Sequence, residues 1–376
     1  MRIGVYLHIP FCPGKCRYCS FISSPFDKQA AREYIGAVDC ELGLRADEVS
    51  NADTLYIGGG TPTVLSLSLL EELVDLLGKR IALESLSEIT VEANPGTLTL
   101  EKAVFLKEAG INRLSLGAQS FEDAELIFLG RSHNSRDIRN AIEIAREAGI
   151  DNLSLDLMFG LPGQDLAGWE RTLHTALQYE PQHLSLYDLT PERGTLLMDA
   201  LEAGEVKLQD DDCRADLYLL ACDMLKAEGL ERYEISNFAH CGYEGKHNIN
   251  YWRSGEYLGI GVSACSRIGA QRWKNTDCRE EYIESSLSLF TNPVHETEKL
   301  DRQTLMNEYI MLALRTTAGA SAVEYQHLFG ENLFDVYGEV CTALVKEGFL
   351  AMTAGGFKLI DKGFLLANRI IIRFMY

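Results

Sequence analysis

The stretch "YLHIPFCPGKCRYCSF", Tyr6 to Phe21, places Cys12, Cys16 and Cys19 within eight residues, directly after a short apolar run. A structural zinc site or a ferredoxin-type cluster normally takes four protein ligands, and no second cysteine pair or nearby Cys/His set supplies a fourth here. The neighbouring His8 falls inside the apolar run, where we expect its side chain to point away from the loop. Three thiolates can hold a [4Fe–4S] cluster and leave one iron open to a small molecule. We therefore expect the missing ligand to be the functional feature.

Length and charge limit the possible functions. The chain has 376 residues, which predicts one large domain and a smaller one. Its formal net charge is −20, which argues against a nucleic-acid partner because binding of phosphates depends on a basic surface. An anionic ligand can bind only where Arg or Lys side chains gather locally.

The remaining cysteines and the hydropathy favour a reducing compartment. The irregular spacing of most of the cysteines does not indicate a disulfide framework. We interpret six of them as buried or inert thiols: Cys40, Cys213, Cys222, Cys241, Cys278 and Cys341. No apolar run reaches the ~18 residues that span a bilayer, and the first residues leave no room for a targeting segment. We expect a cytoplasmic protein without an integral membrane segment.

Strand-like apolar runs alternate with amphipathic stretches up to about residue 190. The predicted strands are Gly4–Ile9, Thr54–Ile57, Glu88–Glu92, Arg113–Leu116, Asn152–Leu157 and His183–Tyr187. Between them, Ser68 and Glu71 have the spacing of a capping box, Gly110 and Gly149 suit helix C-termini, and Asp165 suits an N-cap. This alternation predicts an α/β fold, a partial (β/α)6 TIM-like barrel with a parallel sheet.

Glycine-rich and polar residues follow the predicted strands, where barrel enzymes place their chemistry. The cysteine loop follows the first strand, and "GGGTPT", Gly58 to Thr63, follows the second. Glycines let a backbone approach a ligand closely, although the same run alone could be a tight turn. Glu92, Gln119 and Asp156 mark the ends of later strands.

The pattern changes after about residue 200. A helix is predicted from roughly Asp210 to Glu228, and a Gly-Gly hairpin between helices is predicted near the C-terminus. We divide the chain into the partial barrel at 1–235, a connecting segment at 236–294 and a small helical, winged domain at 295–376.

The C-x3-C-x2-C spacing after a first strand resembles the signature of radical S-adenosylmethionine proteins. "YLHIPFC", "GGGTPT", "VEANP", "GAQSF" and "DLMFGLPGQ" further resemble the family of HemN-type oxygen-independent coproporphyrinogen III oxidases and their relatives, the HemW heme chaperones. The resemblance extends over nearly the whole chain. It implies a [4Fe–4S] cluster on the three cysteines, with S-adenosylmethionine at the open iron.

The resemblance also implies individual contacts. For the cofactor on the cluster these are Tyr6, Gly59, Glu92 and, as a weaker contact, Cys265, which lies in "GVSACS" where many relatives carry a Gly-Ala-His-Ser type run. Positions that match the second cofactor pocket of the oxidases are Tyr18, Gly60, Thr61, Gln119, Arg131, Asp156 and Thr190. Arg131 could equally be a surface charge, and Asp156 could merely cap a loop.

Three features favour the chaperones over the oxidases. Cys12 lies close to Met1, so we expect the N-terminal arm of the oxidases to be absent, and Phe21 occupies the place of their additional cysteine. The stretch "HNINYW", His247 to Trp252, fits an H-N-x-x-Y-W element that marks the chaperones.

This element makes chemical sense for heme. His247 is the candidate iron ligand, and Tyr251 and Trp252 offer flat faces to a porphyrin. The alternative is that His247, in a polar loop, is a structural hydrogen-bonding residue.

Three hypotheses follow. In the first, the protein carries heme, or another tetrapyrrole, to acceptor hemoproteins, with a possible homodimer linked to the cluster. In the second, it is an enzyme that decarboxylates coproporphyrinogen III to protoporphyrinogen IX. The third, a zinc-stabilised barrel of unrelated function, is disfavoured by the cysteine spacing.

Overall fold

The structure, a computed structural model, describes residues 2–287 and 291–375. Its strands are β1 (Ile3–Ile9), β2 (Phe11–Cys12), β3 (Ser24–Pro25), β4 (Ala52–Gly59), β5 (Glu88–Ala93), β6 (Arg113–Gln119), β7 (Leu153–Phe159), β8 (His183–Asp188), β9 (Glu231–Arg232), β10 (Asn237–Ala239), β11 (Tyr257–Ile260), β12 (Cys265–Ile268), β13 (Gln271–Asn275), β14 (Val294–Lys299), β15 (Ala320–Ser321), β16 (Leu350–Thr353) and β17 (Gly356–Leu359). Its helices are α1 (Lys28–Leu44), α2 (Ala46–Val49), α3 (Leu67–Arg80), α4 (Leu100–Glu108), α5 (Asp123–Leu129), α6 (Ser135–Glu147), α7 (Leu166–Leu177), α8 (Leu196–Glu202), α9 (Asp211–Ala227), α10 (Lys246–Trp252), α11 (Arg279–Leu287), α12 (Arg302–Ala313), α13 (Ala322–Phe329), α14 (Leu333–Glu347), α15 (Asp361–Phe364) and α16 (Ala367–Ile371).

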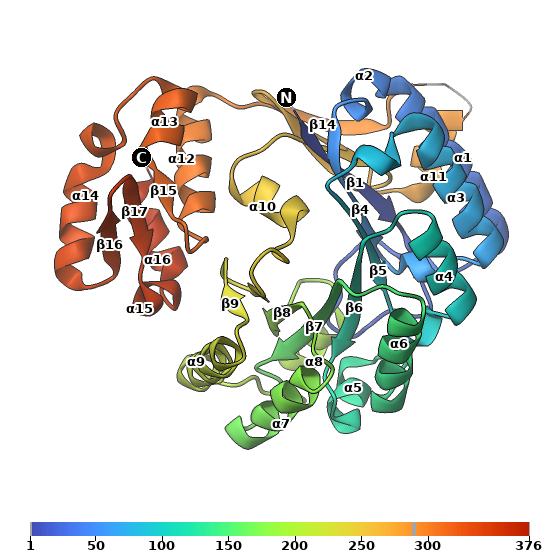
Figure 1. Cartoon of the computed structure of the whole chain (residues 1–376), viewed down its shortest axis with the longest axis horizontal. Helices are drawn as coiled ribbons and strands as arrows, with labels where there is room; N and C mark the ends of the chain where they lie inside the picture. Colours follow the sequence, from blue (N-terminus) through green and yellow to red (C-terminus); the bar gives the residue numbers. More distant parts are fainter. Residues whose placement is uncertain (1, 288–290, 376) are drawn as a thin grey trace.

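A twisted sheet forms the centre of the molecule, with helices over its outer face (Figure 1). Strands β1, β4, β5, β6, β7 and β8 lie side by side in that order, and each pairs in parallel with the next. These are the six predicted strands, so the predicted α/β class with a parallel sheet is confirmed. A further parallel neighbour, β11, pairs with the free side of β1, and the antiparallel strands β12, β13 and β14 extend the sheet beyond it. The sequence analysis did not predict these four strands.

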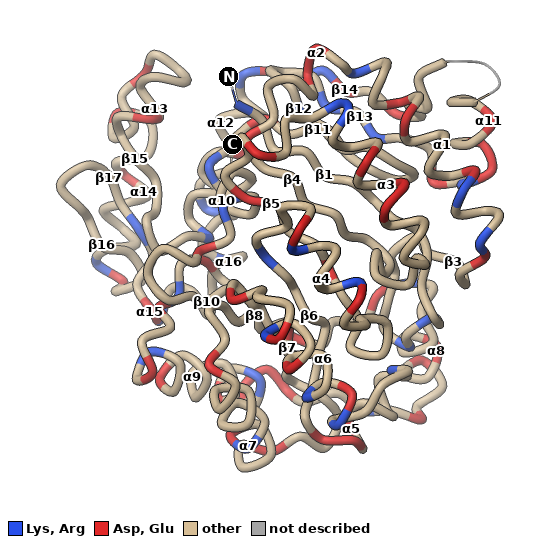
Figure 2. The backbone as a smooth tube through the Cα atoms, turned by 45° about the vertical axis from the view of Figure 1, so that its right-hand side comes forward, with Lys and Arg blue, Asp and Glu red and all other residues tan. Residues whose placement is uncertain are grey.

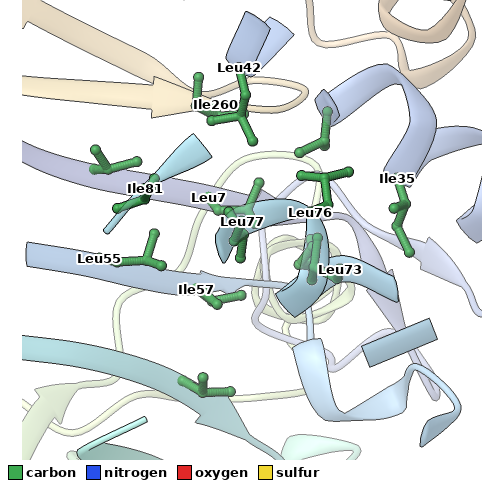
Figure 3. Packing of buried hydrophobic residues seen from close by; sticks show 14 of the residues in the cluster. Leu7, Ile35, Leu42, Leu55, Ile57, Leu73, Leu76, Leu77, Ile81 and Ile260 are labelled. Carbon is green, nitrogen blue, oxygen red and sulfur yellow. The ribbon is translucent and has the colours of Figure 1, made fainter. Parts of the chain in front are cut away.

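The core beneath the outer helices follows from the apolar pattern. Helix α3 buries Leu69, Leu73 and Leu77 on one face, at the i, i+4 spacing of an amphipathic helix. Figure 3 shows Leu73 and Leu77 packed near Leu7 and residues of β4. Burying a leucine side chain of this kind contributes about 1.5–3 kcal/mol, so this face holds the helix on β1 and β4.

The predicted helix ends are mostly confirmed, with one error. Asp165 caps α7 by accepting from the N–H of Gly168, and Gly110 and Gly149, with φ of +91° and +77°, follow α4 and α6. The capping box of Ser68 and Glu71 is wrong, because α3 begins at Leu67 and Ser68 lies inside its first turn.

The C-terminal helices form a separate apolar core with the three-stranded sheet β15–β17–β16. Helix α10 packs against β1, β4 and α12, and thus lies between the large sheet and this C-terminal unit (Figure 1). The backbone also joins the two parts, since the N–H of Thr317 donates to the carbonyl of Tyr233. The predicted boundaries at 235/236 and 294/295 stay a prediction.

Charged residues, red and blue in Figure 2, are found on many of the peripheral helices. No helix in the described ranges has the length and hydrophobicity needed to cross a bilayer.

Candidate functional site

The three cysteines lie on the loop that leaves β1, and all three thiols are free and half-buried. The loop is fixed by Arg131, whose Nη1 lies 3.5 Å from the Sγ of Cys16 and 3.4 Å from the hydroxyl of Tyr18. Burial raises the pKa of the Cys19 thiol. Among residues 2–287 and 291–375, no three His, Cys, Asp or Glu side chains are grouped as ligands of one ion.

His8 does not point away from this loop, as the sequence analysis expected. Its Nε2 lies 2.9 Å from the carbonyl oxygen of Ile22, and its Nδ1 lies 3.0 Å from the hydroxyl of Tyr6. A strand residue reaches the loop because the chain folds back over the end of β1. Both ring nitrogens are hydrogen-bonded, so His8 is structural.

The glycine run after β4 closes tightly on the cysteine loop. Gly59 has φ +108°, and a Cβ there would lie 2.5 Å from the ring of His8. A Cβ on Gly60 would lie 2.5 Å from the carbonyl oxygen of Phe11 and 3.0 Å from the Sγ of Cys12. The hydroxyl of Thr61 lies 3.7 Å from the same sulfur. Only glycine permits this approach, so the run forms a cradle beside the first thiol.

Glu92 is the penultimate residue of β5 and lies against this cradle. Its carboxylate accepts from the hydroxyl of Tyr56 at 2.8 Å and from the N–H of Gly59 at 3.0 Å. Burial raises the pKa of Glu92 to about 7; the nearby charge of Asp156 also raises it, and the two hydrogen bonds oppose the rise. A carboxyl group held in this way can accept from a cationic ammonium group of a ligand.

A bulge at the end of β6 sets the position of Gln119. The register with β7 shifts between Leu116 and Gln119, and Gln119 adopts φ +67°. The Nη2 of Arg131 donates to the carbonyl of Gly117, and the buried His133 contacts the carbonyl of Ala118 through Nε2. The irregular backbone is therefore held by two side chains from the loop after α5.

Arg131 is not a surface charge. Its Nη2 also donates to the Oδ1 of Asn94 at 2.6 Å, so one guanidinium joins the cysteine loop, β5 and β6. Sequence reasoning missed Asn94 and His133 as partners of the site. Asn94 lies in the "VEANP" motif, but nothing in the sequence pairs it with a distant arginine.

Asp156 lies in the middle of β7, not at its end as the sequence analysis expected, because the strand continues to Phe159; Thr190 follows the end of the neighbouring strand β8. The carboxylate of Asp156 accepts from the hydroxyl of Ser115 at 3.1 Å, and burial raises its pKa against hydrogen bonds from Ser185 and Ser115 and the charge of Arg113. Thr190 is exposed, and its hydroxyl donates to the carbonyl of Asp188. Thr190 and the cysteine loop thus both follow the carboxyl ends of strands of the parallel sheet.

The predicted heme element is a helix, not a polar loop. Helix α10 is anchored by Glu88 of β5, whose carboxylate accepts from the N–H groups of Lys246 and His247. His247 is buried, and its ring nitrogens lie 2.8 Å from the hydroxyls of Thr54 and Tyr251. Burial lowers the pKa of His247 to about 3, with the charge of Arg113 adding to the effect. Both nitrogens have partners, which fits the alternative that His247 is a structural hydrogen-bonding residue, and its role as an iron ligand stays a prediction.

Tyr251 and Trp252 do not face one ligand. Tyr251 lines a cavity of about 620 Å³ shared with Tyr6 and Cys265, which we call the sheet cavity. Trp252 lines a second cavity of about 620 Å³, against Tyr309 and other residues of the C-terminal unit. Consecutive residues of a helix are rotated by about 100° around its axis, so the two rings reach different cavities.

Comparison with known proteins identifies two domains. The profile of the Radical SAM superfamily matches residues 6–176, and that of the HemN C-terminal domain matches residues 300–366. The structure is similar to that of coproporphyrinogen III oxidase (HemN) from Escherichia coli, a Radical SAM enzyme, with a TM-score of 0.84 over 99% of this chain and 90% of that one. The sequence identity of 23% makes this a likeness of fold.

Full-length relatives are closer in sequence. The heme chaperone HemW of Bacillus subtilis is 37% identical over 375 residues, covering 99% of both chains. HemW of Escherichia coli is 32% identical, covering 99% of this chain and 98% of its own. The mouse mitochondrial radical S-adenosyl methionine domain-containing protein 1 is 31% identical, covering 99% and 87%.

The superfamily implies a [4Fe–4S] cluster and S-adenosylmethionine, and the donor set fits them. Cys12, Cys16 and Cys19 supply soft thiolate ligands, and the glycine cradle at Gly60 allows close approach to Cys12. With these domains and relatives along its whole length, the chain belongs to the HemW heme chaperone family of radical S-adenosylmethionine proteins.

Proposed function

We propose that this protein is a heme chaperone, which binds heme and delivers it to acceptor hemoproteins. The observation that carries the proposal is the 37% identity to the heme chaperone HemW of Bacillus subtilis over 99% of both chains. The expected cytoplasmic location, the homodimer and the lack of a nucleic-acid partner accompany this proposal as predictions.

In the proposal, Cys12, Cys16 and Cys19 hold the [4Fe–4S] cluster. When bound, the cluster supplies an electron and an open iron for the amino and carboxylate groups of S-adenosylmethionine. Glu92 accepts from the N–H of Gly59 and suits the amino group of such a ligand. The N–H groups of Gly60 and Thr61 donate to the carbonyls of Ile9 and Phe11 and hold the glycine run against the cysteine loop. Tyr6, Gly59 and Cys265 complete the contacts proposed for this cofactor.

A second pocket for S-adenosylmethionine is proposed next to the first one, beside the same cysteine loop. Its members are Tyr18, Gly60, Thr61, Gln119, Arg131, Asp156 and Thr190. Support comes from Arg131, which contacts both Cys16 and Tyr18, and from Gly117, where a Cβ would lie 3.1 Å from the Nε2 of Gln119 and 3.2 Å from the Nη2 of Arg131. Gln119 and Arg131 therefore lie close together beside the cysteine loop.

The alternative is an oxygen-independent coproporphyrinogen III oxidase. It is the weaker candidate, since the likeness to that enzyme is one of fold. In both cases the ligand is a tetrapyrrole.

One paired assay separates the two. Protein is reconstituted anaerobically, iron and sulfide are counted, and hemin is titrated in and then offered to an apo-hemoprotein. The same preparation receives coproporphyrinogen III, S-adenosylmethionine and a reductant. We expect hemin binding and transfer without formation of protoporphyrinogen IX. Decarboxylation would overturn the chaperone proposal.

The cysteine assignment has its own control. Replacing Cys16 with Ser should abolish the iron and sulfide content, because the cluster loses one of three ligands. Cys241 is an exposed free thiol outside the loop, so Cys241→Ser should keep the full content.

A further inference from the structure

The guanidinium of Arg131 lies beside a cluster thiol without a carboxylate to balance its charge. Its Nη1 is 3.5 Å from the Sγ of Cys16. Within residues 2–287 and 291–375 its hydrogen-bond partners are a thiol, a phenol, a side-chain amide and a backbone carbonyl. The chain has 55 acidic and 35 basic residues, so the lack of an acidic partner here is unusual. A partly buried cation without a counter-charge is costly, and a thiolate at Cys16 supplies that counter-charge.

Asn94 holds the other side of this guanidinium. Its Oδ1 accepts from the Nη2 of Arg131 at 2.6 Å, and the carbonyl of Gly117 accepts from the same nitrogen at 2.8 Å. Asn94 is buried, and its own backbone is held as well. Its N–H donates to the hydroxyl of Thr63, and its carbonyl accepts from the hydroxyl of Thr97 at 2.8 Å. The side-chain oxygen of Asn94 is therefore an acceptor in a fixed position after β5.

The bulge of β6 limits the positions that the guanidinium can take. A Cβ on Gly117 would lie 3.2 Å from the Nη2 of Arg131 and 3.1 Å from the Nε2 of Gln119, closer than ordinary contact. A guanidinium is planar and rigid, so fixing Nη2 between Asn94 and Gly117 also directs Nη1. The fixed direction of Nη1 is towards Cys16.

The other two thiols have different surroundings. The Sγ of Cys12 lies 3.7 Å from the hydroxyl of Thr61, a neutral group. Near Cys19 the charge is that of Lys15, an exposed residue whose ammonium group donates to the carbonyl of Phe21. Water and salt screen an exposed charge, whereas a partly buried guanidinium in contact with sulfur is screened much less. Of these two cations, Arg131 therefore has the stronger effect on a bound metal centre.

We propose that Arg131, through its hydrogen bond to Cys16, makes the bound [4Fe–4S] cluster easier to reduce, and that Asn94 is the residue that positions Arg131 for this role. Reduction adds one electron from an external one-electron donor, and no bond forms or breaks. The added negative charge extends onto the thiolate sulfurs, so a cation at Cys16 stabilises the reduced form more than the oxidised form. This inference rests on the cluster in the proposed function and is independent of heme.

The reduction potential is measured on the full-length, anaerobically reconstituted protein. Titanium(III) citrate is added stepwise, the reduced cluster is followed by electron paramagnetic resonance, and each titration is normalised to its own end point, so iron content does not affect the result. At a fixed potential, Arg131→Met should lower the ratio of reduced to oxidised cluster about tenfold, equal to about 59 mV for one electron. Lys15→Gln, which removes an exposed charge from the same loop, should leave the ratio unchanged. An unchanged ratio in Arg131→Met would overturn the proposal.

The role of Asn94 has its own test, which retains the arginine. Asn94→Ala releases the guanidinium, so the ratio of reduced to oxidised cluster should fall in the same direction, about threefold or more. In the Arg131→Met background, Asn94→Ala should cause no further change, because the amide acts on the cluster only through the guanidinium. Asn112→Ala is the control, since it removes an amide that accepts from the N–H of Ile89 at the other end of these strands. A wild-type potential in Asn94→Ala, or an equal shift in both backgrounds, would refute the positioning role.

These outcomes are distinct from those that test the proposed function. Hemin binding and transfer by the wild type test the chaperone proposal, and their failure would leave the measured potentials as they are. A wild type that binds no iron and sulfide would refute the cluster and this inference with it. If the wild type holds the cluster and the variants at positions 94 and 131 share its potential, only this inference fails.

Discussion

The contact between the glycine cradle and the cysteine loop can be tested by adding one carbon atom. In Gly60→Ala, the new Cβ would lie 2.5 Å from the carbonyl oxygen of Phe11, 2.9 Å from that of Ile9 and 3.0 Å from the Sγ of Cys12. Ordinary contact begins at 3.4 Å, and two of the three atoms belong to the backbone, so no side-chain rotation relieves the overlap. The loop that carries Cys12 must move instead.

The expected cost is that of overpacking a well-packed site, about 1–3 kcal/mol in the free energy of unfolding. Because the displaced loop includes a cluster ligand, iron and sulfide bound per chain after anaerobic reconstitution should fall as well. Chemical denaturation of the metal-free protein and an iron assay of the reconstituted protein measure the two effects separately.

Gly14 provides the matched control. It lies in the same loop between Cys12 and Cys16, and a Cβ there would meet nothing within 4 Å. Gly14→Ala should therefore keep both stability and iron content. Equal behaviour of Gly60→Ala and Gly14→Ala would refute the argument that close approach requires glycine at position 60.

Three further predictions follow from the site. The pKa of Glu92 rises from 4.5 to about 7 on folding, so the folded state holds the proton more tightly and the free energy of unfolding falls by about 3 kcal/mol as pH rises from 4.5 to 7. Glu92→Gln should remove this pH dependence from denaturation curves, and an unaltered dependence would contradict the buried carboxyl group. His247→Ala should lower the free energy of unfolding by about 2–4 kcal/mol, because it leaves a cavity and unpaired hydroxyls on Thr54 and Tyr251, but it should retain hemin binding in a titration. Loss of the hemin spectrum without loss of stability would identify His247 as the ligand. Arg131→Lys should lower the iron and sulfide bound per chain, since one ammonium group cannot reach both Cys16 and the β5–β6 side. Arg136→Lys, at an exposed arginine, is the control, and equal iron content in the two variants would count against the bridging role of Arg131.

Much of the barrel could be predicted because its strands are buried on both faces. The run "LSLDLMF" in β7 is nearly all buried, and its repeated leucines indicated a strand although Ser154 and Asp156 interrupt them. The antiparallel extension gives no such signal. Strand β14 reads "VHETEK" and is mostly exposed, so neither alternation nor an apolar run distinguishes it from a loop.

Helix α10 was missed for a different reason. Its sequence, "KHNINYW", contains few strong helix formers, and its first N–H groups are satisfied by Glu88, far away in the chain. A cap supplied from a distant strand leaves no mark in the local sequence.

In the candidate site, too, some residues could be predicted from the sequence, and others depend on contacts that only the fold creates. The cysteines could be predicted from their spacing, and the strand-end residues from their position after apolar runs. The partners of Arg131 could not, because they depend on the register of β5 and β6 and on a bulge at Gln119. For the same reason, sequence alone could not place Cys265 opposite Lys274.

The position of β1 in the sheet has a consequence for how the protein is made. The strand that leads into the cysteine loop has β4 on one side and β11 on the other, and β11 is translated about 250 residues later. At roughly 5–20 residues per second, the ribosome needs on the order of 10–50 s to supply it. During that interval one edge of β1 has no partner from the nascent chain, and the thiols are already outside the ribosome. Iron and sulfide inserted before translation ends would enter a sheet that still lacks β11, so we expect the metal centre to be assembled after the polypeptide is complete.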